Sequence, residues 1–420
     1  MHRVAEPRVL ETRPVAAAPT VAAAQHANTN EAAAPHAAGP HATKPHPYPF
    51  WAPRFWHGMS HGPWVKMLAR NRFAISPSCL PLALSINSAT ILNSFAGVFT
   101  KLMFAHRARA TKLAAPPLFV LGHWRSGTTL LHELLILDSR HTYPNTYECF
   151  APHHFIWTEW FVPPLLRKLL PSTRPMDAME AGWERPQEDE FALCNLGIPT
   201  PYLCWAFPRH GPVNDEYLDL LSLPEEERER WKSALKTFVH YVAAMRNRRI
   251  ILKSPTHTAR VKTLLEVFPD ARFVHIVRDP LALFPSTVRL WNTLSQVQGL
   301  QTVDDGIPWV ERQVLDTFAR MYERYEQDRN LIPAGRLAEV RYEDLIADPV
   351  GEMQSVYEQL ELGGYSRVRP GIQKYADEHR EYRPGRYNLS PATVERVRRH
   401  WAPYFERYGY AHNTADSAAS

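Results

Sequence analysis

A short segment at positions 120–131, VLGHWRSGTTLL, contains the residue types that bind a phosphate group. Its two glycines let the backbone approach an anion closely, its three hydroxyl side chains add hydrogen-bond donors, and its arginine adds a positive charge. An apolar stretch precedes the turn and a helical pattern follows it, so the backbone N–H groups at the start of a helix would face the anion. The candidate binding residues are Gly122, Arg125, Ser126, Gly127, Thr128 and Thr129.

The spacing of Gly122 and Gly127 matches the phosphate-binding loop of kinases and nucleotide hydrolases, but that loop continues with a lysine. Here Thr128 follows, and the cation lies inside the turn at Arg125. Because the lysine cradles the terminal phosphates of a nucleoside triphosphate, its absence predicts a different anion. A kinase or hydrolase remains the alternative function, and a turn without a ligand the alternative structure.

A second segment, FVHIVRDPLALFPSTVRLW at 273–291, reads as an apolar strand that ends in a charged turn. Ser286 follows Arg278 by eight residues. A guanidinium fork together with a hydroxyl suits a second phosphate, such as one on a ribose. The alternative is a structural ion pair between Arg278 and Asp279 at the end of the strand.

The two segments together resemble the phosphosulfate loop and the 3′-phosphate motif of the sulfotransferases, closest to the branch with bacterial and tyrosylprotein sulfotransferases. The similarity runs in order from about 117 to 410. It implies transfer of a sulfuryl group from 3′-phosphoadenosine 5′-phosphosulfate (PAPS) to a hydroxyl or amine, in line and without a metal. It also implies that Arg125 holds the 5′-phosphate and that Arg278 and Ser286 hold the 3′-phosphate.

A third segment, REYRPGRYNLS at 380–390, matches the family more loosely. It resembles the basic, glycine-containing segment that closes over the nucleotide, which would make Arg383 and Gly385 cofactor-binding residues. Solvated surface arginines are an equally good account of it.

Lys253 follows an apolar strand in the segment ILKSP, and it matches a lysine that the resemblance places near the bridging oxygen of the donor. The alternative is an exposed lysine at the end of a strand. His257 lies close enough in sequence to reach the same loop, either as an acid or base or as an ordinary residue at a helix start.

The acceptor hydroxyl needs a general base. In the tyrosylprotein branch a glutamate follows the first helix after a short strand, and this layout points to Glu148, in a register about two residues longer than in that branch. The rivals are His257 and the acidic cluster Glu188, Asp189 and Glu190, which lies between two aromatic residues. Such a charge run is more often a solvated face.

Apolar segments alternate with helical patterns along the central part of the chain. The segments 117–122, 248–255 and 271–280 read as strands, and 128–138 and 260–270 read as helices. This alternation predicts an α/β protein with three layers and a central parallel sheet. Its binding residues would lie at the carboxyl ends of the strands.

The remaining segments predict the domain organisation. Residues 114–412 form the sulfotransferase domain, with helices and loops of about 144–247 inserted over the sheet as a lid, and residues 46–113 form a helical extension. Residues 1–45 are rich in Ala, Pro and His and residues 413–420 are similar, so both read as disordered tails. Ser390 and Pro391 mark the start of a late helix.

Charge and cysteine content exclude several classes of protein. The net charge of +5 is small for 420 residues, so a nucleic-acid partner is not expected. The four cysteines show no CxxC pair or metal-ligand spacing, which predicts no metal site and a reducing, cytoplasmic compartment. No apolar run follows the start of the chain, so a secretory signal is not expected.

Residues 73–100 contain no charged side chain. Pro77, Pro81 and several hydroxyl and amide residues interrupt the run, which favours a buried helical pair or a partner-facing helix over a membrane span. The alternative is peripheral membrane contact through 50–110, because basic residues flank the run and tryptophans precede it. A non-catalytic family member that docks in this way is a further alternative.

The acceptor is predicted only as a small molecule, a lipid or a saccharide, because the twelve tryptophans suit sugar stacking and a lipid pocket equally well. The sequence predicts no oligomeric state.

Overall fold

A computed structural model describes residues 48–49, 52–166, 182–303, 306–380 and 387–410. The two predicted tails, Arg383 and Gly385 lie outside the described residues.

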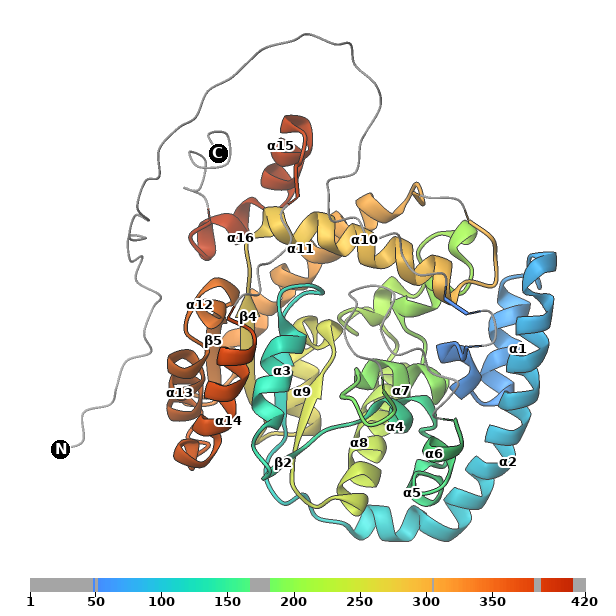
Figure 1. Ribbon diagram of the computed structural model, residues 1–420. Coiled ribbons are helices and arrows are strands. Elements are labelled where there is room, and N and C mark those ends of the chain that lie inside the picture. Colours follow the sequence, from blue (N-terminus) through green and yellow to red (C-terminus); the bar gives the residue numbers. More distant parts are fainter. Residues whose placement is uncertain (1–47, 50–51, 167–181, 304–305, 381–386, 411–420) are drawn as a thin grey trace. The chain divides into compact units, whose positions relative to one another are not determined.

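Five strands form one sheet in the order β2-β3-β1-β4-β5, and every neighbouring pair is parallel. Figure 1 shows helices on both sides of these strands. This architecture confirms the predicted α/β fold with a central parallel sheet, and the three strands predicted from the sequence are β1, β3 and β4. The strands are β1 (Leu118–Leu121), β2 (His141–Thr142), β3 (Arg249–Lys253), β4 (Arg272–Val277) and β5 (Leu337–Arg341).

Alternate residues of each strand enter different hydrophobic clusters, because successive side chains of a strand point to opposite faces. Leu118 and Val120 of β1 belong to one cluster, whereas Phe119 and Leu121 belong to the other. Both faces are therefore covered, as a parallel sheet requires. The helices on the Leu118 face are α3 (Thr128–Ile136), α12 (Tyr342–Ala347), α13 (Pro349–Gln359) and α14 (Tyr365–Glu378).

The larger cluster fills the Phe119 face, and it includes the inserted segment and the N-terminal helices. Trp56 and Trp64 of the N-terminal part are fully buried there. The helices contributing to this cluster from the second half of the chain are α8 (Glu225–Met245), α9 (Val261–Val267), α10 (Pro280–Gln298), α11 (Val310–Asp328), α15 (Pro391–His400) and α16 (Ala402–Arg407), with the short 3-10 turn η7 (Pro255–Ala259). A second 3-10 turn, η8 (Arg329–Leu331), follows α11. The side chain of Ser390 caps α15, as predicted.

The inserted segment consists of short helices joined by loops. Its elements are α4 (Thr146–Phe150), α5 (Phe155–Thr158), α6 (Val162–Leu166), α7 (Asp189–Asn195), η4 (Pro201–Trp205), η5 (Pro208–His210) and η6 (Asp215–Tyr217). The N-terminal elements are η1 (Phe55–Gly58), α1 (His61–Arg70), η2 (Pro77–Cys79) and α2 (Leu80–Ala110).

The uncharged run does not form a buried helical pair. Most of it lies in the single helix α2, whose outer face is exposed and which follows the outer edge of the fold in Figure 1. The expectation of a buried pair was wrong because hydropathy cannot distinguish an apolar face that meets the core from one that meets solvent.

The register of the sheet places the carboxyl ends of three strands close together. β1 and β3 end within one residue of each other, and β4 continues two residues beyond the end of β1. Val120 of β1 is paired with Lys253 of β3 and with Val274 of β4. The turns that follow β1, β3 and β4 therefore share one edge of the sheet, with β1 in the middle. Ligands of open parallel sheets bind at this edge, where connections from the central strands diverge.

Candidate active site

The turn after β1 holds its backbone in conformations that favour glycine. Gly122 has φ +146° and Gly127 has φ +105°. A Cβ atom at Gly122 would lie 2.8 Å from the carbonyl oxygen of Ile276, and one at Gly127 would lie 2.4 Å from the ring of Tyr342. Arg125 also has a positive φ, 69°, which is unusual for a residue with a side chain. The glycines thus fit a tight backbone cradle.

Hydrogen bonds fix the shape of this turn from within and from a neighbouring strand end. Ser126 Oγ donates to the carbonyl oxygen of His123 at 2.7 Å. The Gly122 N–H donates to Thr258 Oγ1 at 2.8 Å. Thr128 and Thr129 begin α3, so the first N–H groups of that helix follow the turn directly. A helix start after a tight glycine turn is suited to an anion.

The predicted ligands of the two phosphates lie together. Arg125 Nε donates to Ser286 Oγ at 3.0 Å, and Arg278 Nη1 donates to the carbonyl oxygen of Arg125 at 2.8 Å. The Arg278 guanidinium also lies 4.1 Å from the centre of the Tyr342 ring. We call Arg125, Arg278, Ser286 and Tyr342 the donor-side cluster. Asp279 caps α10 by accepting from the Leu281 N–H at 2.9 Å.

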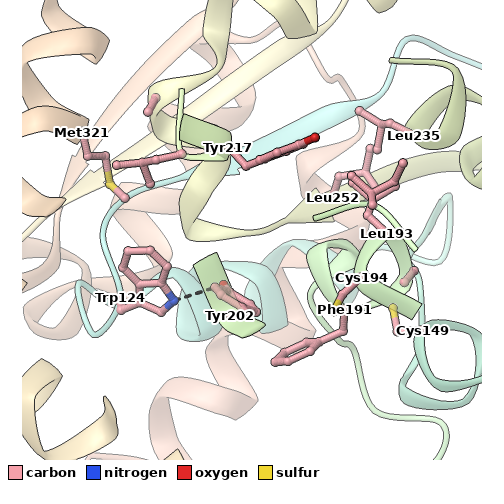
Figure 2. Packing of buried hydrophobic residues seen from close by; sticks show 14 of the residues in the cluster. Trp124, Cys149, Phe191, Leu193, Cys194, Tyr202, Tyr217, Leu235, Leu252 and Met321 are labelled. Carbon is pink, nitrogen blue, oxygen red and sulfur yellow. Dashed lines mark hydrogen bonds between the residues drawn. The ribbon is translucent and has the colours of Figure 1, made fainter. Parts of the chain in front are cut away.

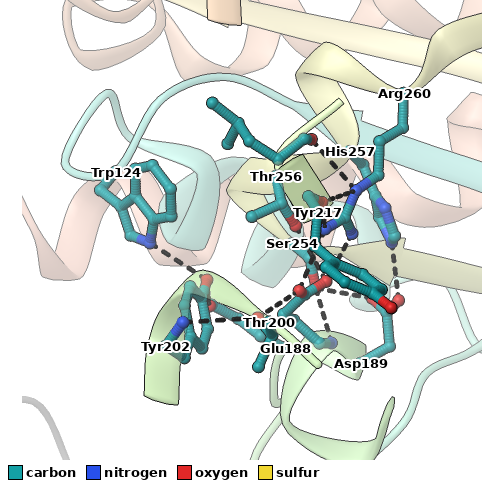
Figure 3. Close-up of polar contacts among 12 residues, drawn as sticks. Trp124, Glu188, Asp189, Thr200, Tyr202, Tyr217, Ser254, Thr256, His257 and Arg260 are labelled. Carbon is teal, nitrogen blue, oxygen red and sulfur yellow. Dashed lines mark hydrogen bonds and ion pairs between the residues drawn. The ribbon is translucent and has the colours of Figure 1, made fainter. Parts of the chain in front are cut away.

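Lys253 is buried at the end of β3 rather than exposed. Its ammonium group donates to Glu188 Oε1 at 2.9 Å. The other oxygen of Glu188 accepts from the Tyr202 hydroxyl at 2.7 Å, and that hydroxyl accepts from the Trp124 indole N–H at 3.1 Å (Figure 3). We call Lys253, Glu188, Tyr202 and Trp124 the lid-side cluster, because the lid supplies two of its members.

The Tyr202 phenol is a donor in this chain of contacts. Burial, together with the Glu188 carboxylate, raises the pKa of Tyr202 far above its usual range. The phenol therefore keeps its proton and offers it to Glu188. The Glu188 side chain retains an exposed fraction of 16%, whereas that of Lys253 retains 5%. Glu188 is thus a carboxylate that is held by two donors and still reaches solvent.

Aromatic packing holds the lid-side cluster in place (Figure 2). The Tyr202 ring stacks on Trp205 with centroids 4.4 Å apart, and Trp124 meets Trp291 edge-on at 5.6 Å. The ring centroids of Phe191 and Tyr202, both in the lid, are 5.1 Å apart. The rings of Trp124 and Tyr202, whose centroids are 6.0 Å apart, join the turn after β1 to the lid, so the position of Glu188 is coupled to the phosphate-binding turn.

Asp189 and Glu190, the other two members of the acidic cluster, are buried, although a run of acidic residues is more often exposed to solvent. Asp189 accepts from Ser254 Oγ at 2.9 Å and pairs with His257 Nε2 at 2.6 Å (Figure 3). Glu190 pairs with Arg260. Burial alone would raise the pKa values of both acids, but their partners outweigh it and hold them below the usual range. His257 is fully buried with Asp189 and anchors the lid to the β3 end.

Glu148 lies in a different environment from Glu188. It closes a reciprocal cap at the start of α4, where its carboxylate accepts from the Asn145 N–H at 2.9 Å and its own N–H donates to Asn145 Oδ1 at 2.8 Å. It also pairs with Arg246. The residue is fully buried, and burial raises its pKa to about 8, although Arg246 opposes this shift.

Among the described residues, no group of three or more His, Cys, Asp and Glu side chains is placed to hold a metal ion.

Three residues of the site were not predicted from the sequence. They are Trp124, Tyr202 and Tyr342. Trp124 lies inside the turn after β1, so its place in the sequence could have identified it. The two tyrosines reach the site only through tertiary packing.

The chain is similar to known sulfotransferases in sequence. A model described as "Sulfotransferase family" matches residues 116–366. The omega-hydroxy-beta-dihydromenaquinone-9 sulfotransferase Stf3 of Mycobacterium bovis is 42% identical over 369 residues, which cover 88% of this chain and 94% of that protein. Human carbohydrate sulfotransferase 6 is 25% identical over 266 residues, covering 57% and 62% of the two chains.

The fold is similar to solved structures of mycobacterial sulfotransferases. STF9 of Mycobacterium avium has a TM-score of 0.58 at 20% identity, with 83% of this chain and 96% of that chain covered. STF1 of Mycobacterium tuberculosis has a TM-score of 0.55 at 17% identity, with 81% and 90% covered. These structures show the fold, whereas the family is shown by the family match, which spans more than half of the chain, and by the 42% identity to Stf3. The chain belongs to the sulfotransferase family and is a sulfotransferase enzyme, which implies PAPS as its sulfuryl donor.

Proposed function

We propose that this enzyme transfers the sulfuryl group of PAPS to a hydroxyl group of a lipid acceptor of the hydroxylated quinol class. The chemistry rests on one observation, the Glu188 carboxylate held between Lys253 and Tyr202 beside the phosphate-binding turn. The acceptor class rests on the 42% identity, over nearly the whole length of both chains, to a sulfotransferase named for a hydroxylated dihydromenaquinone.

The donor-side residues would hold the two phosphates of PAPS, which supplies the sulfuryl group and a phosphate leaving group. The turn from Gly122 to Gly127, with Arg125, Ser126, Thr128 and Thr129, would bind the 5′-phosphate through backbone and hydroxyl donors. Arg278 and Ser286 would bind the 3′-phosphate, since a guanidinium fork and a hydroxyl match its oxygens. The tight glycine cradle is the feature of this chain that fits such a ligand.

We assign the general base to Glu188. A base must reach the acceptor hydroxyl, and Glu188 is a partly exposed carboxylate beside Lys253. Lys253 orients the carboxylate and brings positive charge to the edge where the leaving phosphate would lie. The proton of the acceptor hydroxyl would pass to Glu188 Oε1 or Oε2 as the oxygen attacks sulfur.

Glu148 and His257 suit this role less well. Glu148 is fully buried in a helix cap, and its raised pKa favours the neutral acid at neutral pH. His257 is fully buried and committed to Asp189. Neither side chain offers an exposed, basic atom to a substrate.

The donor is tested first by ligand stabilisation of the full chain. Adenosine 3′,5′-bisphosphate should raise the melting temperature more than ATP with magnesium, because each anion site should hold one phosphate. A ligand at a hundredfold excess over its Kd stabilises a fold by about 2.7 kcal/mol. A shift with ATP and magnesium but none with the bisphosphate contradicts the donor assignment.

The acceptor is tested with sulfur-labelled PAPS and a panel of a hydroxylated dihydromenaquinone, a saccharide, a phenol and a tyrosine peptide. We expect label in the lipid, and none in the matched quinol that lacks the hydroxyl group. Label in the saccharide alone would replace the lipid assignment by a carbohydrate one while leaving the donor assignment intact.

A further inference from the structure

Helix α2 exposes a long row of large apolar side chains. Leu84, Leu92, Phe95 and Leu102 have exposed fractions of 67%, 69%, 73% and 79%. The exposed apolar positions recur at intervals of three and four, so they form one stripe along the helix. A monomeric soluble protein rarely exposes so large a contiguous apolar patch. We call this set the α2 stripe; it consists of Leu84, Ile91, Leu92, Phe95, Val98, Phe99 and Leu102.

The opposite face of α2 has the reverse character. The residues that meet the protein there are mostly small or carry hydroxyl groups, such as Thr90, Gly97 and Thr100. In an ordinary surface helix the large apolar residues face the core and the polar residues face solvent. The inverted arrangement on α2 indicates that its outer face meets an apolar environment of its own. Residues 77–110 are also long and apolar enough to cross a membrane, by length and composition alone.

Aromatic residues of the lid extend the apolar surface beyond the α2 stripe. Phe99 meets Trp157 of α5 edge-on at 5.3 Å, and Trp157 lies 6.0 Å from Phe161. The next aromatic, Trp160, has an exposed fraction of 79%. Figure 1 shows α5 and α6 beside α2. Tryptophan and tyrosine are the side chains enriched at membrane–water interfaces.

The charge of this region is of one sign. No Asp or Glu occurs from 32 through 132. Seven exposed lysines and arginines lie in or just after α1 and α2, and two of them, Arg107 and Arg109, lie in the last turn of α2. Cationic groups beside an apolar surface are attracted to anionic lipid head groups. The exposed cations are Lys66, Arg70, Arg72, Lys101, Arg107, Arg109 and Lys112.

We propose that the α2 stripe docks this enzyme on the surface of an anionic phospholipid bilayer, with α2 lying along the interface and its stripe among the acyl chains. The helix does not span the bilayer, because its inner face is tied to the protein. Asn93 Nδ2 donates to the carbonyl oxygens of His57 and Met59 at 2.7 and 3.0 Å, and the Trp157 indole donates to Thr100 at 2.9 Å. A spanning helix would lose these contacts.

A second copy of the chain is a poorer occupant than a bilayer. Two α2 stripes packed against each other would bring two sets of cations together, and residues 32–132 supply no acid to pair with them. An anionic lipid surface satisfies both the apolar stripe and its charge. This proposal does not depend on the acceptor assignment, because vesicle binding needs no turnover.

The test is flotation of the full-length protein with vesicles. We expect the protein to float with phosphatidylcholine vesicles that contain phosphatidylglycerol, and to float less with phosphatidylcholine alone. Added salt should weaken binding to the anionic vesicles, because it screens the lysines and arginines. A protein that stays at the bottom with both vesicle types overturns the proposal.

Three substitutions locate the docking surface. The triple variant Leu92→Glu, Phe95→Glu, Leu102→Glu should bind anionic vesicles roughly tenfold more weakly or worse, since three apolar side chains leave the interface and three negative charges enter it. The matched control is Leu331→Glu, which alters an exposed leucine on η8. Equal binding by the triple variant and by wild type overturns the proposal. Because the altered side chains are exposed, the variant should keep the melting temperature and the bisphosphate binding of the wild type.

A label and a size measurement separate the bilayer from a second copy. With Cys79→Ser in the background, a polarity-sensitive dye on Phe95→Cys should shift to the blue with anionic vesicles, and the same dye on Leu331→Cys should not. Analytical ultracentrifugation of the wild type without lipid should show a monomer. A dimer that the triple variant abolishes assigns the stripe to a second copy and overturns the bilayer proposal.

Discussion

The donor-side and lid-side clusters share one edge of the sheet but are built in opposite ways. The donor-side cluster combines a turn after β1, a turn and helix after β4, and Tyr342 at the start of α12. Each of its two phosphate-binding segments is continuous in sequence, although Arg125 and Ser286 lie 161 residues apart. The lid-side cluster joins Lys253 to Glu188, which is 65 residues away, and Trp124 to Tyr202, which is 78 residues away. The first cluster binds by local backbone geometry, whereas the second depends on how the lid packs on the sheet.

This difference predicts a division of labour between the clusters. Damage to the donor-side cluster should weaken nucleotide binding, because those residues would face the phosphates. Damage to the lid-side cluster should lower turnover and spare binding.

The largest effect is expected at Glu188. Glu188→Gln keeps the shape of the side chain and removes its basicity, and a positioned base contributes roughly 10²–10⁴-fold in rate. We expect kcat to fall by that factor, while isothermal titration with adenosine 3′,5′-bisphosphate shows a Kd near that of the wild type. Glu184→Gln, at an exposed carboxylate earlier in the lid, is the control. Wild-type turnover in Glu188→Gln would remove the base from the lid-side cluster.

The next effect is expected at Arg278 and falls on binding. Arg278→Ala should raise the Kd for the bisphosphate roughly tenfold to a hundredfold, because hydrogen bonds to charged groups contribute about 1.5–3 kcal/mol. Arg278→Lys should recover only part of the affinity, since an ammonium lacks the guanidinium fork. Titration calorimetry measures both values.

The control for Arg278 is Arg289→Ala, which removes an exposed arginine of α10, the helix that follows Arg278 and carries Ser286. Ser286→Ala should weaken binding in the same sense by a smaller factor. If Arg278→Ala and Ser286→Ala both bind the bisphosphate normally, the donor-side cluster does not hold the 3′-phosphate.

The difference between the donor-side and lid-side clusters also explains which parts of the site could be predicted from the sequence. The donor-side turn was readable because a strand, a glycine turn and a helix start are local patterns, and the parallel sheet followed from alternating strands and helices. The contacts of Glu188 with Lys253 and Tyr202 could not be predicted from such local patterns, because they form only when the lid folds over β3. The pairing of His257 with Asp189 could not be predicted for the same reason.

Glu148 shows a signal that sequence analysis could have used. Asn145 and Glu148 stand three residues apart before a short helix, which is the pattern of a reciprocal cap. That pattern favours a structural carboxylate over a base. The exposure of the outer face of α2 could not be predicted, because composition alone cannot show which face of an apolar helix meets the core.

A smaller effect on turnover is expected at Tyr202. Tyr202→Phe removes the hydroxyl that links Trp124 to Glu188, and a hydrogen bond of this kind contributes about 0.5–1.5 kcal/mol. We expect kcat to fall roughly twofold to tenfold with little change in bisphosphate affinity.

Tyr147→Phe is the matched control for Tyr202→Phe. Tyr147 is also a buried phenol, and its hydroxyl donates to Thr158 at 2.7 Å instead of to a lid-side carboxylate. Its substitution should leave kcat near the value of the wild type. Equal falls in kcat in the two variants would mean that the hydroxyl of Tyr202 acts only through stability.

The smallest effect on turnover is expected at Glu148. Glu148→Gln should keep kcat within about threefold of wild type, because glutamine can also close the cap at this position. The weaker contact with Arg246 should lower stability by about 1 kcal/mol, which is the usual contribution of a hydrogen bond between side chains. A large fall in turnover with intact bisphosphate binding would return the base to Glu148.

The pH dependence of stability gives a second test of Glu148. Its folded-state pKa, raised by burial to about 8, lies above the ordinary value near 4.5, so the native protein binds a proton that the unfolded chain releases. The stabilisation from this proton is complete below about pH 4.5 and is lost as pH rises toward 8. Between these values the melting temperature of wild type should therefore fall more steeply than that of Glu148→Gln. Parallel melting curves for the two proteins would show that Glu148 is ionised in the folded state, which would restore a charged carboxylate to the list of candidate bases.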